Sequence, residues 1–272
     1  MPELPEVEVT CQGIRPHVEG RKLRGASVRE PRLRWPVPPE LDRTVRGRQV
    51  ERVRRRAKYL LLDLAPGGTL LLHLGMSGSL RVAPGDAPPG PHDHLDLHLD
   101  DGRVLRLRDP RRFGAVLWTE EAPEAHPRLA GLGPEPLSAE FDGDHLYRRS
   151  RSRSISVKAF LMDAAVVVGV GNIYASEALF RAGIHPAREA GGIGPEGYRR
   201  LGTALKEVLA AAIAAGGTTL RDFTGGEGSP GYFRQELAVY NRAGEPCPAC
   251  GRPLEKAVIA QRSSFFCPGC QP

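Results

Sequence analysis

The sequence predicts an α+β protein, in which a strand-rich first part is followed by helices and a small metal-binding ribbon. Residues 94–100 alternate strictly between polar and apolar side chains, which is typical of a half-buried β-strand. Residues 198–215 have apolar side chains at the spacing of an amphipathic helix. Four cysteines near the carboxyl end form two C-x2-C pairs. The length of 272 residues is typical of two domains.

The first part of the chain begins with a predicted helix and continues as strands. Pro5 and the neighbouring acidic residues suit a first helical turn, and the helical pattern continues to about His17. From about residue 25 to 118 the pattern indicates strands. Residues 59–64 and 69–74 are two apolar segments separated by a Pro-Gly-Gly turn. Asp101-Gly102 predicts a hairpin that joins residues 94–100 to residues 104–107.

A Gly- and Pro-rich segment at residues 131–136 predicts a linker, beyond which the helical period dominates. The expected helical stretches are residues 146–149, 157–168, 173–182 and 198–215, the last ended by Gly216-Gly217. Residues 218–232 are rich in glycine, and we expect them to be mobile.

The charge balance favours an acidic partner. The formal net charge is +6 and the sequence pI is about 9.3, which suits nucleic acid, although mild basicity also serves solubility alone. Only five of the 38 basic residues are lysine, and a lysine can exchange a proton where arginine stays charged. Each lysine is therefore a candidate for a role that arginine cannot fill. The five are Lys22, Lys58, Lys158, Lys206 and Lys256.

Targeting and membrane signals are not evident in this sequence. No segment has the pattern of a signal peptide, and the apolar run at residues 164–170 is too short to cross a bilayer. We therefore expect a cytoplasmic protein that has no membrane partner. A disulfide framework is not expected, because the fifth cysteine, Cys11, stands apart from the other four.

The cysteine pairs predict one structural zinc ion. Their spacing is C-x2-C-x16-C-x2-C, and four thiolates leave no open coordination position for catalysis. Two redox pairs are the alternative interpretation. Residues 257–259 and 265–266 can form a hairpin between the pairs, with Arg262 near its tip, suited to a DNA phosphate or simply to solvent. The predicted zinc ligands are Cys247, Cys250, Cys267 and Cys270.

Six motifs in order resemble those of the formamidopyrimidine-DNA glycosylase family, which excises 8-oxoguanine and ring-opened purines and then nicks the strand. The match covers nearly the whole chain, and the combination is far more specific than any one motif. The motifs are Pro2-Glu3-Leu4-Pro5-Glu6-Val7-Glu8, Arg55-Arg56-Ala57-Lys58-Tyr59-Leu60-Leu61, His73-Leu74-Gly75-Met76-Ser77-Gly78, Asp109-Pro110-Arg111-Arg112-Phe113-Gly114, Val170-Gly171-Asn172-Ile173-Tyr174-Ala175 and the zinc ribbon.

The resemblance implies an N-terminal helix plus antiparallel β-sandwich, then a helix–two-turn–helix domain that ends in the zinc ribbon. We expect domains at residues 1–132, 137–240 and 241–272. The implied protein is a bifunctional DNA glycosylase and AP lyase that acts on damaged double-stranded DNA. It would be a monomer, with zinc as its ion and no nucleotide cofactor.

The resemblance assigns catalysis to Pro2, Glu3 and Lys58, with Arg262 in the same group. Once Met1 is removed, Pro2 has a secondary amine, and an α-amino group has a pKa of about 8 against about 10.4 for lysine. Such an amine can attack a sugar C1′ to form an iminium ion. Glu3 would act as a general acid and base, and Lys58 would bind the lesion's phosphate and deliver protons.

The resemblance also implies six DNA-contacting residues. Flipping a nucleotide out of the duplex costs a few kcal/mol, which side chains that fill the gap offset. Met76, Arg111 and Phe113 match these gap-filling positions, whereas core packing is the alternative for Met76 and Phe113. His92, Asn172 and, less closely, Arg153 match phosphate contacts, and residues 218–232 match the segment that closes over the flipped base.

Two other functions remain open from the sequence. An endonuclease VIII-like enzyme would act on oxidised pyrimidines, although Leu4 departs from the Pro-Glu-Gly-Pro start usual in that class. A catalytically silent DNA-binding protein would keep the zinc ribbon, but the intact Pro2, Glu3 and Lys58 argue against it.

Overall fold

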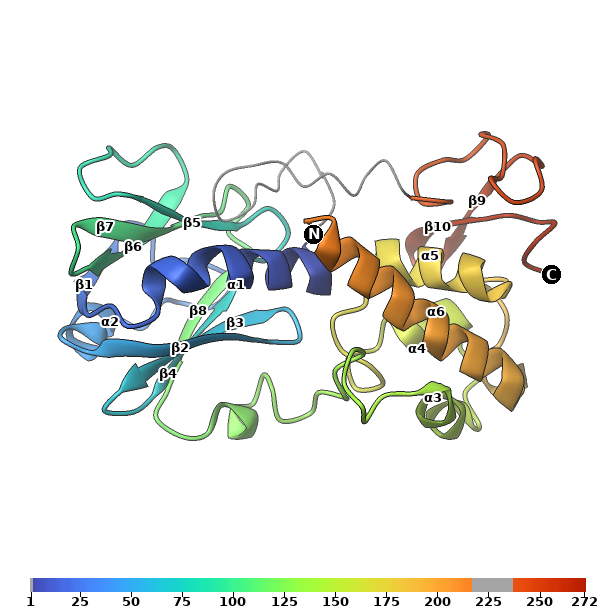
Figure 1. Ribbon diagram of the computed structural model, residues 1–272, viewed down its shortest axis with the longest axis horizontal. Coiled ribbons are helices and arrows are strands. Elements are labelled where there is room, and N and C mark those ends of the chain that lie inside the picture. Colours follow the sequence, from blue (N-terminus) through green and yellow to red (C-terminus); the bar gives the residue numbers. More distant parts are fainter. Residues whose placement is uncertain (1, 217–236) are drawn as a thin grey trace. The chain divides into compact units, whose positions relative to one another are not determined.

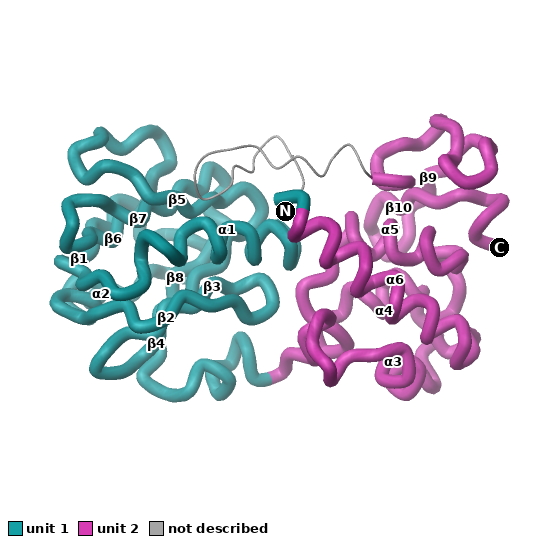
Figure 2. Tube along the Cα trace, in the orientation of Figure 1, with its two compact units in different colours: residues 1–130, 215–232 teal, residues 131–214, 233–272 magenta. Residues whose placement is uncertain are grey.

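The computed structural model describes residues 2–216 and 237–272, so the expected mobile loop at residues 218–232 lies outside the described part. The chain forms two compact units, one built on Met1–Ala130 and one on Gly131–Ala214 and Phe233–Pro272 (Figure 2). The three-domain division at 1–132, 137–240 and 241–272 stays a prediction. No helix in the described residues is long and apolar enough to cross a membrane.

Helix α1 (Leu4–Val18) opens the first unit, as the sequence predicts. Glu3 is its N-cap residue, and Glu3 and Glu6 form a capping box in which the Glu3 N–H donates to Glu6 Oε2 at 2.8 Å. Pro5 lies in the first turn, where its missing N–H costs nothing. The apolar face of α1 packs against β2 and β3 of one sheet and β5 of the other (Figure 1).

Two four-stranded antiparallel sheets pack around one hydrophobic core, which confirms the predicted β-sandwich. One sheet has the order β2-β3-β4-β8 and the other β1-β6-β7-β5 (Figure 1). The short helix α2 (Leu41–Val45) packs against β1. The strands are β1 (Leu23–Val28), β2 (Gln49–Arg56), β3 (Tyr59–Ala65), β4 (Thr69–His73), β5 (Ser79–Pro84), β6 (Asp93–Leu99), β7 (Arg103–Arg108) and β8 (Ala115–Thr119).

Strand β6 is buried on both faces, so the expectation of a half-buried strand is wrong in this respect. Its two aspartates, Asp93 and Asp96, belong to a buried ion network rather than facing solvent. The Asp96 carboxylate accepts hydrogen bonds at 2.8 Å from Arg106, and Arg106 also donates to the carbonyl oxygens of Ala87 and Pro88. The Pro- and Gly-rich loop after β5 is thereby held over this face of the sheet.

The second unit is helical, as predicted, with α3 (Gly143–Ser150), α4 (Val157–Leu161), α5 (Asn172–Ala182) and α6 (Pro195–Ala214). The helical stretch expected at residues 157–168 ends early, at Leu161. Residues 166–168 are three consecutive valines before Gly169, which has φ +79°, and such a run disfavours continued helix. The turn at residues 163–169 leads instead into α5.

The predicted hairpin between the cysteine pairs is present as β9 (Glu255–Ile259) and β10 (Arg262–Phe266). Ala260 and Gln261 form the two-residue tip, and both have positive φ, as a type I′ turn requires. The ribbon has its own small core, to which Val239, Leu254 and Phe265 contribute.

Candidate catalytic and DNA-binding site

The proposed nucleophile lies at the start of α1. Pro2 is buried, and Glu3 is 2% exposed. The capping box fixes the position of Glu3 and places both residues at the helix N-terminus, whose dipole favours an uncharged amine over an ammonium ion. Met1 lies outside the described residues.

Lys58 lies in the two-residue tip that joins β2 to β3, where Arg56 pairs with Tyr59. Ala57, the other tip residue, has φ +55°. Arg55 fastens this tip to α1, because its Nε donates to Glu8 Oε2 at 2.7 Å and its Nη1 donates to the Ala57 carbonyl at 2.9 Å. The Arg55–Glu8 ion pair therefore connects the Lys58 turn to α1, the helix whose N-cap residue is Glu3.

His73, at the end of β4, is a neutral neighbour of Lys58. Burial, with the Lys58 and Arg34 charges, lowers the pKa of His73 to about 4. Its Nδ1 accepts a hydrogen bond of 2.9 Å from the Gly75 N–H, and its ring lies against Tyr59. His73 thus connects the Lys58 hairpin to the loop that contains Met76.

The three predicted gap-filling residues lie on two loops of the first unit that contact each other. Phe113 is 42% exposed, and the Arg111 guanidinium lies over its ring at 5.1 Å. Gly75, with φ +65°, approaches the backbone of Phe113 so closely that a Cβ there would lie 2.4 Å from the Phe113 carbonyl carbon. Met76 is half-buried. An exposed Phe113 is unlike a core residue and suits a surface that fills a gap in DNA.

His92 is exposed and lies at the entrance to β6 with φ +73°, a backbone conformation unusual for a residue with a side chain. Its carbonyl accepts the Asp109 N–H at 2.9 Å, which ties this residue to the loop of Arg111 and Phe113.

In the second unit, Asn172 and the Arg262 turn are brought together. The Asn172 Nδ2 donates to the Ser263 carbonyl at 2.9 Å. Arg262 is exposed and begins β10 directly after the hairpin tip. Asn172 therefore positions the residue that follows Arg262, while its own contact to a phosphate stays a prediction. Arg153 is exposed in the turn after α3, away from this pair in the sequence, and its contact to a phosphate stays a prediction.

Sequence reasoning did not assign a role to Lys158, which the structure places under the same turn. Lys158 is 1% exposed, and its Nζ donates to the Ser263 carbonyl at 3.1 Å and to Ser264 Oγ at 2.7 Å. The rarity of lysine in this chain was the available signal. Asp109, Arg55 and Glu8 were also missed, since each acts through a contact between segments distant in sequence.

The four predicted zinc ligands come together at the base of the ribbon. Their sulfur atoms lie within 4.8 Å of one another, with Cys247 to Cys270 at 3.9 Å and Cys250 to Cys267 at 3.4 Å. A tetrahedral zinc with Zn–S bonds near 2.3 Å places its sulfurs about 3.8 Å apart. The cluster thus fits one structural zinc ion, held by Cys247, Cys250, Cys267 and Cys270.

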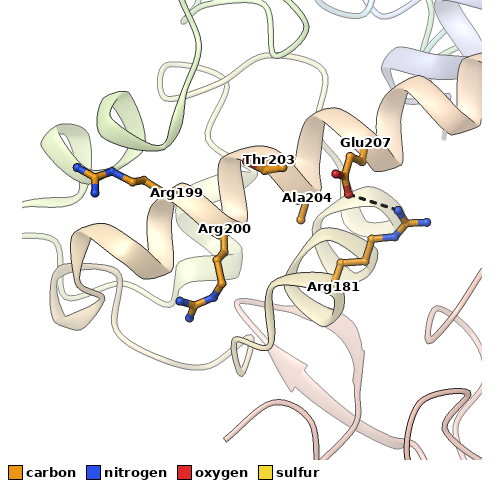
Figure 3. Close-up of a pocket in the computed structure, with 6 residues that line it drawn as sticks. All are labelled: Arg181, Arg199, Arg200, Thr203, Ala204 and Glu207. Carbon is orange, nitrogen blue, oxygen red and sulfur yellow. Dashed lines mark ion pairs between the residues drawn. The ribbon is translucent and has the colours of Figure 1, made fainter.

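A surface pocket of about 380 Å³ lies on the second unit between α5 and α6 (Figure 3). Three arginines line it, but Arg181 is paired with Glu207 at 3.7 Å, and Arg199 is paired with Asp144 and Glu196. This balance of charge makes it a poor anion site, and none of the proposed functional residues lines it.

The first unit is a β-sandwich that opens with a helix N-capped by Glu3, directly after Pro2. The second unit is helical and contains a four-cysteine hairpin. Together these features define a class of zinc-bearing DNA-processing proteins. Three family models match this chain: the formamidopyrimidine-DNA glycosylase N-terminal domain at residues 1–116, its H2TH domain at 132–224, and a zinc finger found in FPG and IleRS at 244–272.

Relatives in sequence and structure agree with these models. The formamidopyrimidine-DNA glycosylases of Stenotrophomonas maltophilia and Alkalilimnicola ehrlichii are each 61% identical over the full length of both chains. The Fpg crystal structure from Thermus thermophilus has a TM-score of 0.89 and 44% identity, covering 99% of this chain and 98% of that one. A complex of Lactococcus lactis Fpg with abasic-site DNA has a TM-score of 0.91 and 32% identity, covering 99% of each chain. The chain belongs to the formamidopyrimidine-DNA glycosylase family.

Proposed function

We propose that this chain is a bifunctional DNA glycosylase and AP lyase that excises oxidised purines, 8-oxoguanine and formamidopyrimidines, from duplex DNA. The observation that carries the proposal is the buried Pro2 directly before Glu3, the N-cap residue of α1, in a chain 61% identical over its full length to formamidopyrimidine-DNA glycosylases. The similar Lactococcus lactis structures hold DNA with Fapy-dG or an abasic site.

In the proposed reaction the free amine of Pro2 attacks C1′ of the damaged nucleotide. The bond from C1′ to the base breaks, and the base leaves with the proton that the amine loses. The bond from C1′ to the ring oxygen O4′ then breaks, O4′ takes a proton from Glu3, and the nitrogen and C1′ form an iminium ion. This cation acidifies the C2′–H bond, so that loss of a proton expels the 3′ phosphate and a second elimination expels the 5′ phosphate. Glu3 moves protons at the sugar ring oxygen, and Lys58 holds the lesion's phosphate and delivers protons during base release.

The remaining residues would hold the DNA. Met76, Arg111 and Phe113 fill the gap left by the flipped nucleotide, and the exposed Phe113 with Arg111 over its ring supports this role. His92, Asn172, Arg153 and Arg262 contact phosphates, with Asn172 on a phosphate beside the lesion and Arg262 in the catalytic group. We propose that the protein acts as a monomer in the cytoplasm, at the nucleoid when bound to DNA.

Excision assays on defined duplexes test the proposal. We expect release of 8-oxoguanine opposite cytosine and cleavage of the strand, with an oxidised pyrimidine in the same duplex processed far more slowly. The reverse preference would favour the endonuclease VIII-like alternative. Binding of the duplex without any cleavage would favour the silent DNA-binding protein.

A further inference from the structure

Asp109 is a fully buried carboxylate that the proposed chemistry does not use. It lies at the end of β7, at 0% exposure, where the chain leaves the sheet toward Arg111 and Phe113. Its side chain accepts two hydrogen bonds from different loops. The Gly114 N–H donates to Oδ2 at 2.7 Å, and Ser77 Oγ donates to Oδ1 at 3.3 Å.

The backbone of Asp109 makes three more contacts. Its N–H donates to the His92 carbonyl at 2.9 Å, while its own carbonyl accepts the Arg112 N–H at 3.2 Å and lies 2.8 Å from His94 Nε2. Five hydrogen bonds therefore converge on one residue of the first unit.

Four of the five partners of Asp109 have one property in common, which is that they lie beside or within a segment proposed to contact DNA. Ser77 follows Met76, Gly114 follows Phe113, and Arg112 lies between Arg111 and Phe113, whereas His92 is itself a proposed phosphate contact. A carboxylate forms stronger hydrogen bonds to N–H and O–H donors than a neutral acceptor does. The tight approach of Gly75 to Phe113 means that a small shift of one loop displaces the other.

We propose that Asp109 is a positioning residue that sets the distance between Met76 and the Arg111–Phe113 pair, and joins both to His92. The inference rests on the proposed function, since it assigns a step of that reaction: the filling of the gap left by a flipped nucleotide. Side chains that enter from two loops fill one gap only if the loops keep a fixed separation. Asp109 fixes this separation through Ser77 on one side and Gly114 on the other.

The test compares two substrates, because extrusion costs least where no intact, stacked base has to be removed from the duplex. Asp109→Ala leaves the buried Gly114 N–H without its acceptor. We expect about tenfold slower excision of 8-oxoguanine opposite cytosine, with cleavage of a duplex that holds a preformed abasic site within about twofold of wild type. Asp109→Asn keeps an acceptor for Gly114 and should recover most of the excision rate.

Two further variants separate positioning from general destabilisation. Asp63→Ala removes a carboxylate that accepts from Arg54 and Thr69 on the other sheet, and it should leave both rates unchanged. In combination with Phe113→Ala, Asp109→Ala should cost little more than Phe113→Ala alone, because both changes remove the same wedge.

The inference is overturned if Asp109→Ala excises 8-oxoguanine at the wild-type rate, slows both substrates equally, or combines additively with Phe113→Ala. If Asp109→Ala does not fold, Ser77→Ala tests the inference instead, because it removes the hydrogen bond from Ser77 to Asp109. Ser77→Ala should slow 8-oxoguanine excision about threefold and leave cleavage of the abasic duplex at the wild-type rate. If it slows both substrates by the same factor, the inference is overturned. A wild-type protein that excises no lesion would instead refute the proposed function, which keeps the two failures distinct.

Discussion

The residues proposed for catalysis are held in position by neighbouring side chains that have no part in the proposed reaction. Glu8 and Arg55 fasten the Lys58 turn to α1, and Arg55 is only 10% exposed. A largely buried guanidinium–carboxylate ion pair is expensive to break, because the loss of one partner leaves the other charge unpaired. His73 adds a neutral link from Lys58 to the Met76 loop. The reacting groups therefore occupy positions determined by contacts among α1, β2 and β4.

His73 predicts a specific dependence of stability on pH. Because its pKa is about 4 in the folded protein and about 6.5 when unfolded, the unfolded chain binds a proton as the pH falls through 6.5 while the folded protein does not. The contribution of neutral His73 to the free energy of unfolding is therefore present in full above pH 6.5, and it is lost progressively as the pH falls toward 4. Between pH 7 and pH 5 we expect His73 to reduce the free energy of unfolding by about 2 kcal/mol.

Denaturant unfolding of the wild type and of His73→Gln at both pH values measures this contribution. Glutamine can still accept the Gly75 N–H but does not titrate, so its stability should fall less over the same interval. Identical losses in the two proteins would show that His73 is not the titrating group.

At the scale of elements, the sequence identified most helices and strands because their patterns are local. Alternation located β6 and β7, Asp101-Gly102 located their turn, and the cysteine spacing located the β9–β10 hairpin. Burial of the polar face of β6 was not predictable, since it depends on Arg106 meeting Asp96 and a loop from elsewhere in the chain. Likewise, α4 ends at Leu161, although its apolar pattern continues to Val168.

The zinc ribbon determines the shape of the turn that presents Arg262, and this predicts an effect of metal loss. Cys267→Ser should release zinc and weaken DNA binding by about tenfold or more, because the ribbon's core is too small to order the hairpin alone. Metal content by atomic absorption and binding to an abasic-site duplex are the measurements.

Cys11→Ser is the matched control, since Cys11 is a buried thiol in α1 outside the cluster. It should keep one zinc ion per chain and bind DNA normally. Full metal content in Cys267→Ser, or DNA binding equal to that of Cys11→Ser, would contradict a structural role for the metal.

At the scale of the whole molecule, the motifs predicted which residues would carry the chemistry, but not the contacts that hold them. Pro2, Lys58, Phe113 and Arg262 stood in recognisable motifs, and their roles stay proposals. Lys158 and Asp109 could not be assigned, because their significance lies in partners about 105 and 32 residues away along the chain, Ser263 and Ser77. Local patterns do not encode such pairings.

The central claim is that the amine of Pro2 forms a covalent iminium ion with the damaged nucleotide. Borohydride reduction during turnover of an 8-oxoguanine duplex, followed by proteolysis and mass spectrometry, tests it most directly. We expect one stable adduct, located on an N-terminal peptide that begins with Pro2, and the same adduct from Lys58→Arg. An adduct on Lys58, or no adduct although the duplex is bound, would contradict the claim.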